Sequence, residues 1–342
     1  MFVIREAGPK DFSGVFALAK FLDSYNLPAD PVFIRELLRT SEKSFGGLLP
    51  RSKARYLFVL EGRKRIVGCS LIIAKHGTPG HPHLWFSLDR IVKRSKTLGV
   101  RKSHRVLRLG GTEDGPTETG GLVVLPRYRH SPERCGLQLA YVRFLYMAMH
   151  PERFEETVLI EYRGAMGAGD KSPFWEAIGR VFTGLPYRRA DRLSTRNKEF
   201  IQGLLPEEPI FCALLPDRVQ RAIGAIHPSA RPAAAMAARI GFRPIQQVEP
   251  FDGGPYYTAN RKKIRLVRET RRLPVVQRNI GTGYRNGTRY PGFLVARETG
   301  GHFRAVLAEG AISAGRFKME EEAFRKLKMK TGDFSYVCAV PR

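Results

Sequence analysis

The sequence predicts an α+β fold that ends in a small β-rich domain. Short apolar, β-branched runs alternate with segments whose apolar residues recur every three to four positions, which are the patterns of strands and amphipathic helices. From about Tyr257 the composition shifts to short strand-like runs, so we expect one domain over residues 1–256 and a second over residues 257–342. A chain of 342 residues, 43% of them hydrophobic, can bury a core in both.

The first part of the chain predicts a strand, two helices and a β-hairpin. Phe2–Arg5 is a short strand, and Pro9 suits the first position of the helix that follows. Pro31–Glu42 has the apolar spacing of a second helix. Two apolar runs, Tyr56–Glu61 and Ile66–Lys75, are separated by a polar turn and indicate a hairpin.

The segments that follow carry weaker signals. Leu84–Leu109 is basic and of mixed pattern, and we expect Gly110–Gly121 to form a loop. The stretch His76–His83 contains three histidines, but it is rich in Gly and Pro, and no carboxylate or thiol accompanies them. We therefore expect no metal site.

The stretch Leu122–Met149 combines a strand, a basic loop and a helix. The strand stops at Pro126, and the helix begins near Gly136. The loop between them contains Arg127, Arg129 and Arg134. Because the first N–H groups of a helix lack partners and its dipole is positive there, this arrangement predicts an anion site. A solvated basic loop is the alternative interpretation.

Helices and strands alternate again in the remainder. Thr157–Glu161 is a strand, and Ser172 followed by Pro173 is typical of a helix start. We expect helices over Asn197–Leu205, Pro216–Ile226, Pro232–Ile240 and Glu320–Lys328, and strands over Phe242–Phe251, Pro274–Gln277, Gly292–Arg297, Phe303–Ala308 and Phe334–Val340.

The net charge of +26 is the unusual bulk property. Such a field attracts nucleic acid, an anionic membrane surface or a phosphorylated cofactor. No zinc-finger spacing or ribonucleoprotein aromatic motif is present, so charge alone is a weak argument for nucleic-acid binding. No run has the length of a membrane span, no signal peptide begins the sequence, and the four cysteines are scattered. We expect a cytoplasmic protein.

The order of these elements resembles that of the acyl-CoA N-acyltransferase superfamily, the GNAT type. Within that superfamily the chain resembles the arginine N-succinyltransferases over essentially its whole length. The matching pieces are Glu161-x-Arg-Gly164, Ser172-Pro-Phe-Trp, Ile226-His-Pro228 and Phe251-Asp-Gly-Gly-Pro255. The resemblance implies a mixed, mostly antiparallel sheet flanked by helices.

The resemblance also implies a function and two site residues. The family transfers succinyl from succinyl-CoA to the α-amino group of L-arginine in arginine catabolism, and its members form dimers. The position matching His227 is the family's proton donor, and the position matching Leu122 contacts succinyl-CoA. No metal is implied. Histidine suits proton exchange because it titrates near neutral pH.

The remaining candidates follow from what acyl transfer requires. Backbone groups near Leu122 and Val124 can hold the pantetheine, while Arg129, Arg134 and Gly136 face the phosphates. The superfamily loop usually has glycine at the place of Arg134, which is a departure from the pattern.

Three residues are candidates for holding the substrates. Arg163 could pair with the succinyl carboxylate, and Glu161 and Asp252 with a guanidinium. A structural ion pair or turn is the alternative for each. Because a +26 protein repels a cationic acceptor at long range, ornithine or another amine is a second acceptor hypothesis. A catalytically inactive, nucleic-acid-associated protein is the alternative from another class.

Overall fold

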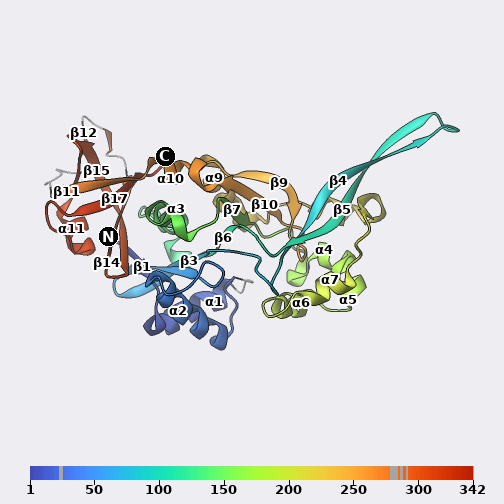
Figure 1. Cartoon of the computed structure of the whole chain (residues 1–342), viewed down its shortest axis with the longest axis horizontal. Coiled ribbons are helices and arrows are strands. Elements are labelled where there is room, and N and C mark those ends of the chain that lie inside the picture. The colour runs from blue at the N-terminus through green and yellow to red at the C-terminus, as the bar shows by residue number, and fades with distance from the viewer. Residues whose placement is uncertain (23–25, 278–283, 286–287, 290–291, 342) are drawn as a thin grey trace.

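The structure is a computed structural model that describes residues 1–22, 26–277, 284–285, 288–289 and 292–341. Fifteen strands of the described chain form one sheet, and most neighbouring strands pair antiparallel. Two pairs are parallel, β6 with β7 and β11 with β16. The molecule is elongated, with the C-terminal strands at one end and a long hairpin at the other (Figure 1). The predicted α+β fold, with a mixed and mostly antiparallel sheet flanked by helices, is confirmed.

The N-terminal layer packs helices on both faces of the sheet. It contains β1 (Val3–Glu6), α1 (Phe12–Leu22), α2 (Pro31–Phe45), β2 (Arg55–Gly62), β3 (Arg65–Ile73), β6 (Thr117–Val124) and α3 (Cys135–Met149). Leu57 and Val59 of β2 pack with α1 and α2, whereas Tyr56 and Phe58 pack with α3. This alternation follows from the two-residue period of a strand and covers both faces of the hairpin.

The sheet continues past β6 through strands that position the site. These are β7 (Thr157–Glu161), β10 (Pro255–Asn260), β9 (Arg243–Val248), β4 (His83–Ser95), β5 (Val100–Thr112) and β8 (Ile210–Phe211). The parallel pairing of β6 with β7 is limited to Thr117 with Val158 and Glu118 with Leu159. Beyond these positions the two strands part.

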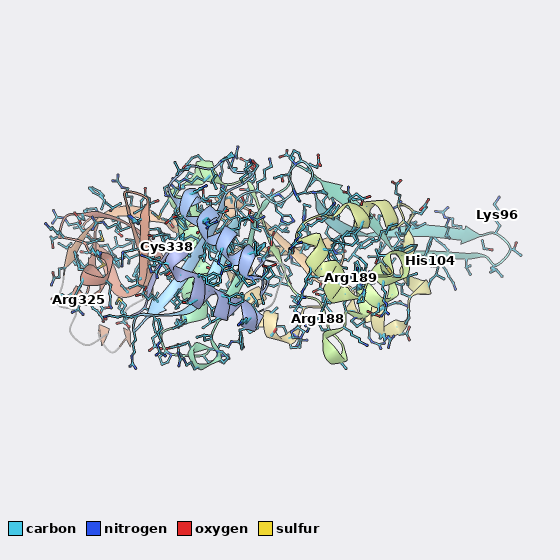
Figure 2. All side chains as sticks on the ribbon, turned by 90° about the horizontal axis from the view of Figure 1, so that it is seen from below. Lys96, His104, Arg188, Arg189, Arg325 and Cys338 are labelled. Carbon is cyan, nitrogen blue, oxygen red and sulfur yellow. The ribbon has the colours of Figure 1, made fainter. Side chains whose placement is uncertain are left out.

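No element was predicted for Leu84–Leu109, and the loop predicted for Gly110–Gly121 was wrong. The basic segment forms β4 and β5, which pair over 13 positions and project from the body (Figures 1 and 2). The predicted loop Gly110–Gly121 instead ends β5 and begins β6. Two of the glycines in these strands are required by the structure. At Gly110 a Cβ would lie 2.8 Å from the Trp85 ring, and Gly121 has a φ of +56°, which favours glycine.

Short helices cover the sheet beside the hairpin. They are α4 (Pro173–Ala177), α5 (Gly179–Thr183), α6 (Tyr187–Ser194), α7 (Glu199–Leu204) and α8 (Asp217–Ala222), whereas α9 (Arg231–Arg239) packs against α3. Ser172 caps α4 as predicted, since its Oγ accepts a hydrogen bond from Trp175 N–H. The Trp175 ring is fully buried and stacks on Phe251 at 4.8 Å between centroids. The motif Ser-Pro-Phe-Trp therefore anchors these helices.

The C-terminal part extends the same sheet. It contains α10 (Arg265–Glu269), β11 (Arg271–Gln277), β14 (Gly292–Thr299), β15 (His302–Ser313), β16 (Arg316–Met319), α11 (Glu321–Leu327) and β17 (Phe334–Ala339), besides the short pair β12 (Tyr284–Arg285) and β13 (Thr288–Arg289). Antiparallel pairing of β1 with β15 joins it to the N-terminal strands, and an apolar cluster that includes Val306, Phe317 and Phe324 forms its own core. The domain boundary after residue 256 stays a prediction. None of the described helices is both long enough and apolar enough to cross a bilayer.

Candidate active site

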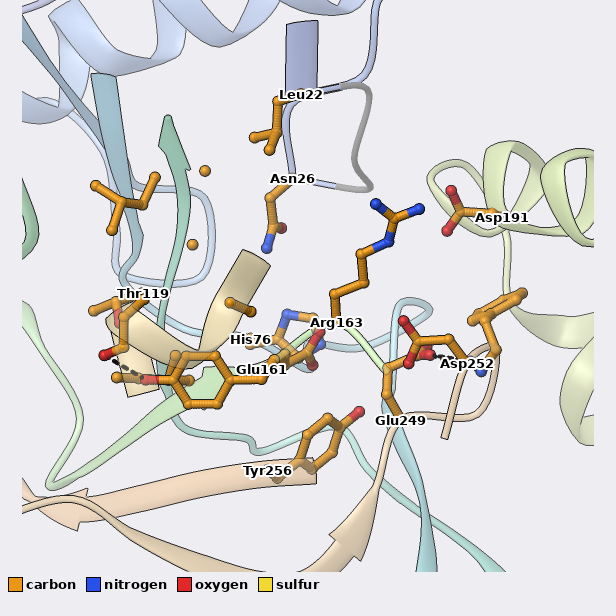
Figure 3. Close-up of a pocket in the computed structure, with 18 of the residues that line it drawn as sticks. Leu22, Asn26, His76, Thr119, Glu161, Arg163, Asp191, Glu249, Asp252 and Tyr256 are labelled. Atoms are coloured by element: carbon orange, nitrogen blue, oxygen red, sulfur yellow. Dashed lines mark hydrogen bonds between the residues drawn. The ribbon is translucent and has the colours of Figure 1, made fainter. Parts of the chain in front are cut away.

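A cavity of about 690 Å³ opens where β6 and β7 part. Gly120 to Leu122 of β6 form one wall, and Glu161 to Arg163, at and after the end of β7, form the opposite wall. Residues of α1, α3, α6 and α9 line the remaining sides. Figure 3 shows Leu22 of α1 and Asp191 of α6 on two of these sides. Because β6 has no strand partner on this side beyond Glu118, its backbone can offer hydrogen bonds to an extended ligand.

Carboxyl groups are concentrated in this cavity. Glu161, Asp191, Glu249 and Asp252 line it, and Figure 3 shows them converging from different elements. Burial and the charge of Glu118 raise the pKa of Glu161 well above its usual value, and burial together with Asp252 and Glu161 does the same for Glu249. A cation bound beside Glu161 and Glu249 would relieve this repulsion. The same cavity is also lined by six cationic side chains, Lys20, Arg143, Arg163, Arg188, Arg192 and Lys198, so it offers partners for both charges of an amino acid.

Asp252 also has a structural role. Its Oδ2 atom accepts a hydrogen bond from Gly164 N–H and its Oδ1 atom one from Gly254 N–H, both at 2.8 Å. Glu249 in turn accepts hydrogen bonds from the N–H groups of Phe251 and Asp252. The two carboxyl groups therefore fix the Asp-Gly-Gly-Pro turn against the segment that follows β7.

A second polar group lies at the wall near the start of β6. Glu118 is fully buried, with Asn26 Nδ2 at 2.5 Å from Oε1 and His76 Nδ1 at 2.7 Å from Oε2. His83 lies beside His76, with ring centroids 4.7 Å apart, and its Nδ1 atom is 3.9 Å from Glu161 Oε1. The sequence interpretation missed these contacts because Glu118 was assigned to a loop.

His227 lies at the rim of the cavity. Its backbone N–H donates a hydrogen bond to the carbonyl oxygen of Arg163 at 2.8 Å. Its Nδ1 atom is 2.7 Å from the hydroxyl oxygen of Ser229, and Ser229 lines the cavity, as Arg163 does. His227 itself is half-buried and does not belong to the lining residues. The structure thus places the predicted proton donor next to the predicted substrate-binding residue.

The predicted phosphate-binding residues lie around the N-terminus of α3. Of the two β6 residues predicted to hold the pantetheine, Leu122 lines the cavity, whereas Val124 is 7% exposed and belongs to the core. Arg129 Nε donates to the Val124 carbonyl oxygen. Arg134 precedes α3 in the left-handed conformation, with φ 56° and ψ 44°, and a Cβ at Gly136 would meet nothing within 4 Å. The left-handed conformation at residue 134 explains why glycine is usual there.

A parallel strand pair that parts around a cavity, followed by a basic loop and a helix N-terminus, defines an acyl-CoA N-acyltransferase of the GNAT type. The model of one family, described as arginine N-succinyltransferase beta subunit, matches residues 2–266. The chain therefore belongs to the arginine N-succinyltransferase family.

Similar proteins match over nearly the whole chain. The arginine N-succinyltransferase of Citrobacter koseri is 32% identical over 97% of this chain and 96% of its own, and that of Escherichia coli is 31% identical over the same shares. The solved structure of arginine/ornithine succinyltransferase subunit AI from Pseudomonas aeruginosa superposes with a TM-score of 0.86 at 29% identity. It covers 100% of this chain and 99% of its own.

Proposed function

We propose that this protein transfers the succinyl group of succinyl-CoA to the α-amino group of L-arginine, as a step of arginine catabolism. The observation that carries the proposal is the acidic floor of the cavity, beside a β6 edge suited to pantetheine. A cationic acceptor favours ionisation of the buried carboxyl groups, and this local attraction offsets the long-range repulsion by a chain of net charge +26. The names of the relatives agree with this assignment.

The acceptor is held by the acidic residues. Glu161 and Asp252 meet the cationic side chain, and Arg163 supplies a positive charge for a substrate carboxylate. Holding the amine against the thioester carbon converts the reaction into an effectively unimolecular step. The neutral amine nitrogen attacks the carbonyl carbon, the C–S bond breaks and no enzyme-bound acyl intermediate forms. The proton that the nitrogen loses balances the one that His227 gives to the leaving thiolate.

The donor lies along β6 and the start of α3. The backbone N–H at Leu122 faces the thioester, and Val124 continues the strand towards the loop. Arg129, Arg134 and the N–H groups after Gly136 hold the phosphates. His227, fixed by Arg163 and Ser229, gives a proton to the leaving thiolate.

An acceptor screen with succinyl-CoA tests this function. L-arginine should give N-succinylarginine by mass spectrometry, and L-norleucine, which lacks the cationic group, should give no product. Preference for ornithine would shift the assignment to the second acceptor hypothesis and leave the reaction class intact. Product from norleucine at the same rate would contradict the role of the acidic floor. A dimeric assembly and a cytoplasmic location stay predictions.

The hairpin β4–β5 favours a second candidate activity, the binding of a polyanion. Three pairs of cations face each other directly across its two strands, Arg90 with Arg105, Lys93 with Lys102 and Arg94 with Arg101. Like charges in such positions destabilise a hairpin unless an anion neutralises them. Lys96 marks the projecting tip in Figure 2.

A nucleic-acid titration tests this second activity. Binding of a duplex should weaken steeply between about 50 and about 200 mM salt. Lys93→Ser with Lys102→Ser should reduce binding more than Lys10→Ser with Lys43→Ser, a matched pair of exposed lysines elsewhere. Equal losses in both double variants would assign the effect to net charge alone.

A further inference from the structure

Arg143 is a buried cation in the wall of the cavity. It lies in the middle of α3, is 4% exposed and lines the cavity. Its Nε atom donates a hydrogen bond to the Ala140 carbonyl oxygen at 3.1 Å. No carboxylate of the described residues forms an ion pair with it, so its charge is left without an internal counterion.

Such a charge is unfavourable unless an anion faces it. Burial lowers the pKa of Arg143 to about 10, which leaves the guanidinium protonated at neutral pH but poorly solvated. A buried charge is stabilised by a partner of opposite sign, and a guanidinium matches a carboxylate in geometry. The anion must therefore come from a ligand.

The surrounding wall is apolar. Helices α3 and α9 line it with Phe144, Ala233, Met236 and similar residues. The two tyrosines in this wall already donate their hydroxyl groups, Tyr141 to the Met236 carbonyl oxygen and Tyr162 to the Ala233 carbonyl oxygen. Methylene groups with a terminal carboxylate fit such a surface, because the chain meets apolar atoms and the charge meets Arg143.

We propose that Arg143 binds the distal carboxylate of the succinyl group and so selects a dicarboxylic acyl donor over a monocarboxylic one. This inference rests on the proposed function and deepens it. Under this proposal Arg163, an exposed residue of the cavity lining, binds the carboxylate of the acceptor amino acid.

Calorimetric binding of two acyl-CoAs to the full chain, without acceptor, tests the proposal. Butyryl-CoA is the matched probe, since it has a methyl group where succinyl-CoA has the carboxylate. The protein should bind succinyl-CoA about 10- to 100-fold more tightly. Arg143→Met should bind both donors equally, with unchanged affinity for butyryl-CoA, and Arg143→Lys should keep part of the preference.

The outcomes separate this inference from the proposed function. Equal affinity of the unaltered protein for both donors, or an undiminished preference in Arg143→Met, would overturn the role of Arg143 alone. Failure to bind either donor would overturn the proposed function as well. Arg163→Met is the control, because it should retain the donor preference. If Arg143→Met does not fold, the affinities of the unaltered protein and of Arg143→Lys for the two donors still test the role of Arg143.

A second inference rests on a different observation, the pair of histidines beside Glu161. His76 follows β3, His83 begins β4 and Glu161 ends β7, and one donor atom from each lies within 4.8 Å of the others. The side chains of His76 and His83 are 8% and 4% exposed, and His76 Nε2 and His83 Nδ1 have no hydrogen-bond partner among the residues that the structure describes. The expectation of no metal site rested partly on the lack of a carboxylate near these histidines in the sequence. In the fold, Glu161 lies beside both of them.

The surroundings suit a metal ligand. The His83 ring packs against the rings of His76, Trp85 and Tyr256, which hold it beside Glu161. His76 Nδ1 lies 2.7 Å from Glu118, and a ligating histidine commonly donates its other ring N–H to a carboxylate in this way. Asn26 holds Glu118 in turn.

From this geometry we infer a site for one divalent cation of the Zn²⁺ type, bound by His76, His83 and Glu161. Two imidazole nitrogens and a carboxylate oxygen are donors typical of Zn²⁺, which would draw them to about 2.0–2.2 Å from the ion. Because Glu161 lines the cavity, and on the proposed function meets the acceptor, bound metal should compete with the acceptor.

Titration of the chelator-treated full chain with Co²⁺ and Zn²⁺ tests the site independently of activity. One equivalent of Co²⁺ should produce an intense visible absorption band that Zn²⁺ abolishes. His83→Phe should lose the band, Glu118→Gln should weaken metal binding about 10- to 100-fold, and His81→Ala, an exposed histidine of the same segment, should change neither. No band in the unaltered protein, or an equal loss in His81→Ala, would overturn the site even if His83→Phe does not fold.

Discussion

The backbone N–H of His227 donates a hydrogen bond to the carbonyl oxygen of Arg163, with 2.8 Å between nitrogen and oxygen. This contact joins the turn before α9 to the segment after β7, two parts of the chain that are far apart in sequence. It survives any substitution of the His227 side chain, because both atoms belong to the backbone. Side-chain chemistry at His227 can therefore be tested without releasing the turn.

His227→Ala should lower turnover by about 100-fold or more, the size of effect expected for lost acid–base catalysis. The KM for succinyl-CoA should change little. Steady-state kinetics measure both, and Ser229→Ala, which removes only the hydroxyl partner of the ring, should have a smaller effect. Near-normal turnover in His227→Ala would mean that the ring only packs.

Glu161→Gln should raise the KM for L-arginine by about 10- to 100-fold, because a carboxyl partner of the acceptor is lost while the side chain keeps its size. Its effect on kcat should be smaller. Since burial raises the pKa values of Glu161 and Glu249, these groups ionise as the pH rises, so the KM for arginine should fall with rising pH. A KM for arginine that does not change with pH in the unaltered protein would contradict this assignment.

Arg134→Gly should have two opposite effects. Removing a side chain from the left-handed conformation should stabilise the fold by ~1 kcal/mol, measured by denaturant unfolding. Loss of the cation should raise the KM for succinyl-CoA. Arg127→Ala, in the same loop, is the control, because its guanidinium lies over the Tyr128 ring. Unchanged KM in Arg134→Gly would remove Arg134 from the phosphate site.

Asp11→Asn should destabilise the fold by about 1.5–3 kcal/mol at pH 7. Burial opposes ionisation of Asp11, but hydrogen bonds from Arg5 and from Gly8 N–H outweigh it and lower the pKa of Asp11 below 3.8. Its stabilising contribution is therefore complete above the unfolded pKa and is lost as pH falls through the lower folded value. Denaturation midpoints of the two proteins should converge below about pH 4; a constant difference would contradict the ion pair.

Local signals predicted much of the fold, and pairing between distant strands was the part that they could not predict. Ser172 and Pro173 predict the start of α4, because the effects of a helix cap and of a first-turn proline extend over only a few residues. The position of Glu118 beside His76 depends on the register of β6 against β3, in which Glu118 pairs with Ile73. That register is a tertiary property, and the glycines around it suggested a loop.

In the candidate site, too, the sequence predicted some residues, whereas others could be found only from the tertiary structure. His227, Arg163 and Asp252 were identified through a family resemblance, and the structure brings His227 and Asp252 into contact with the Arg163–Gly164 segment. Glu249 and Arg143 carry no local motif. They become visible only when β9 and α3 close the cavity, since a strand-end glutamate and a helical arginine are both ordinary surface residues in sequence patterns.

The most direct test of the central claim is acceptor-dependent release of free thiol from succinyl-CoA by the purified protein. The acidic cavity predicts saturable thiol release with L-arginine or ornithine, and release at the rate of the acceptor-free reaction with L-norleucine. No release above that rate with either cationic amino acid, whichever acyl-CoA is offered, would contradict it.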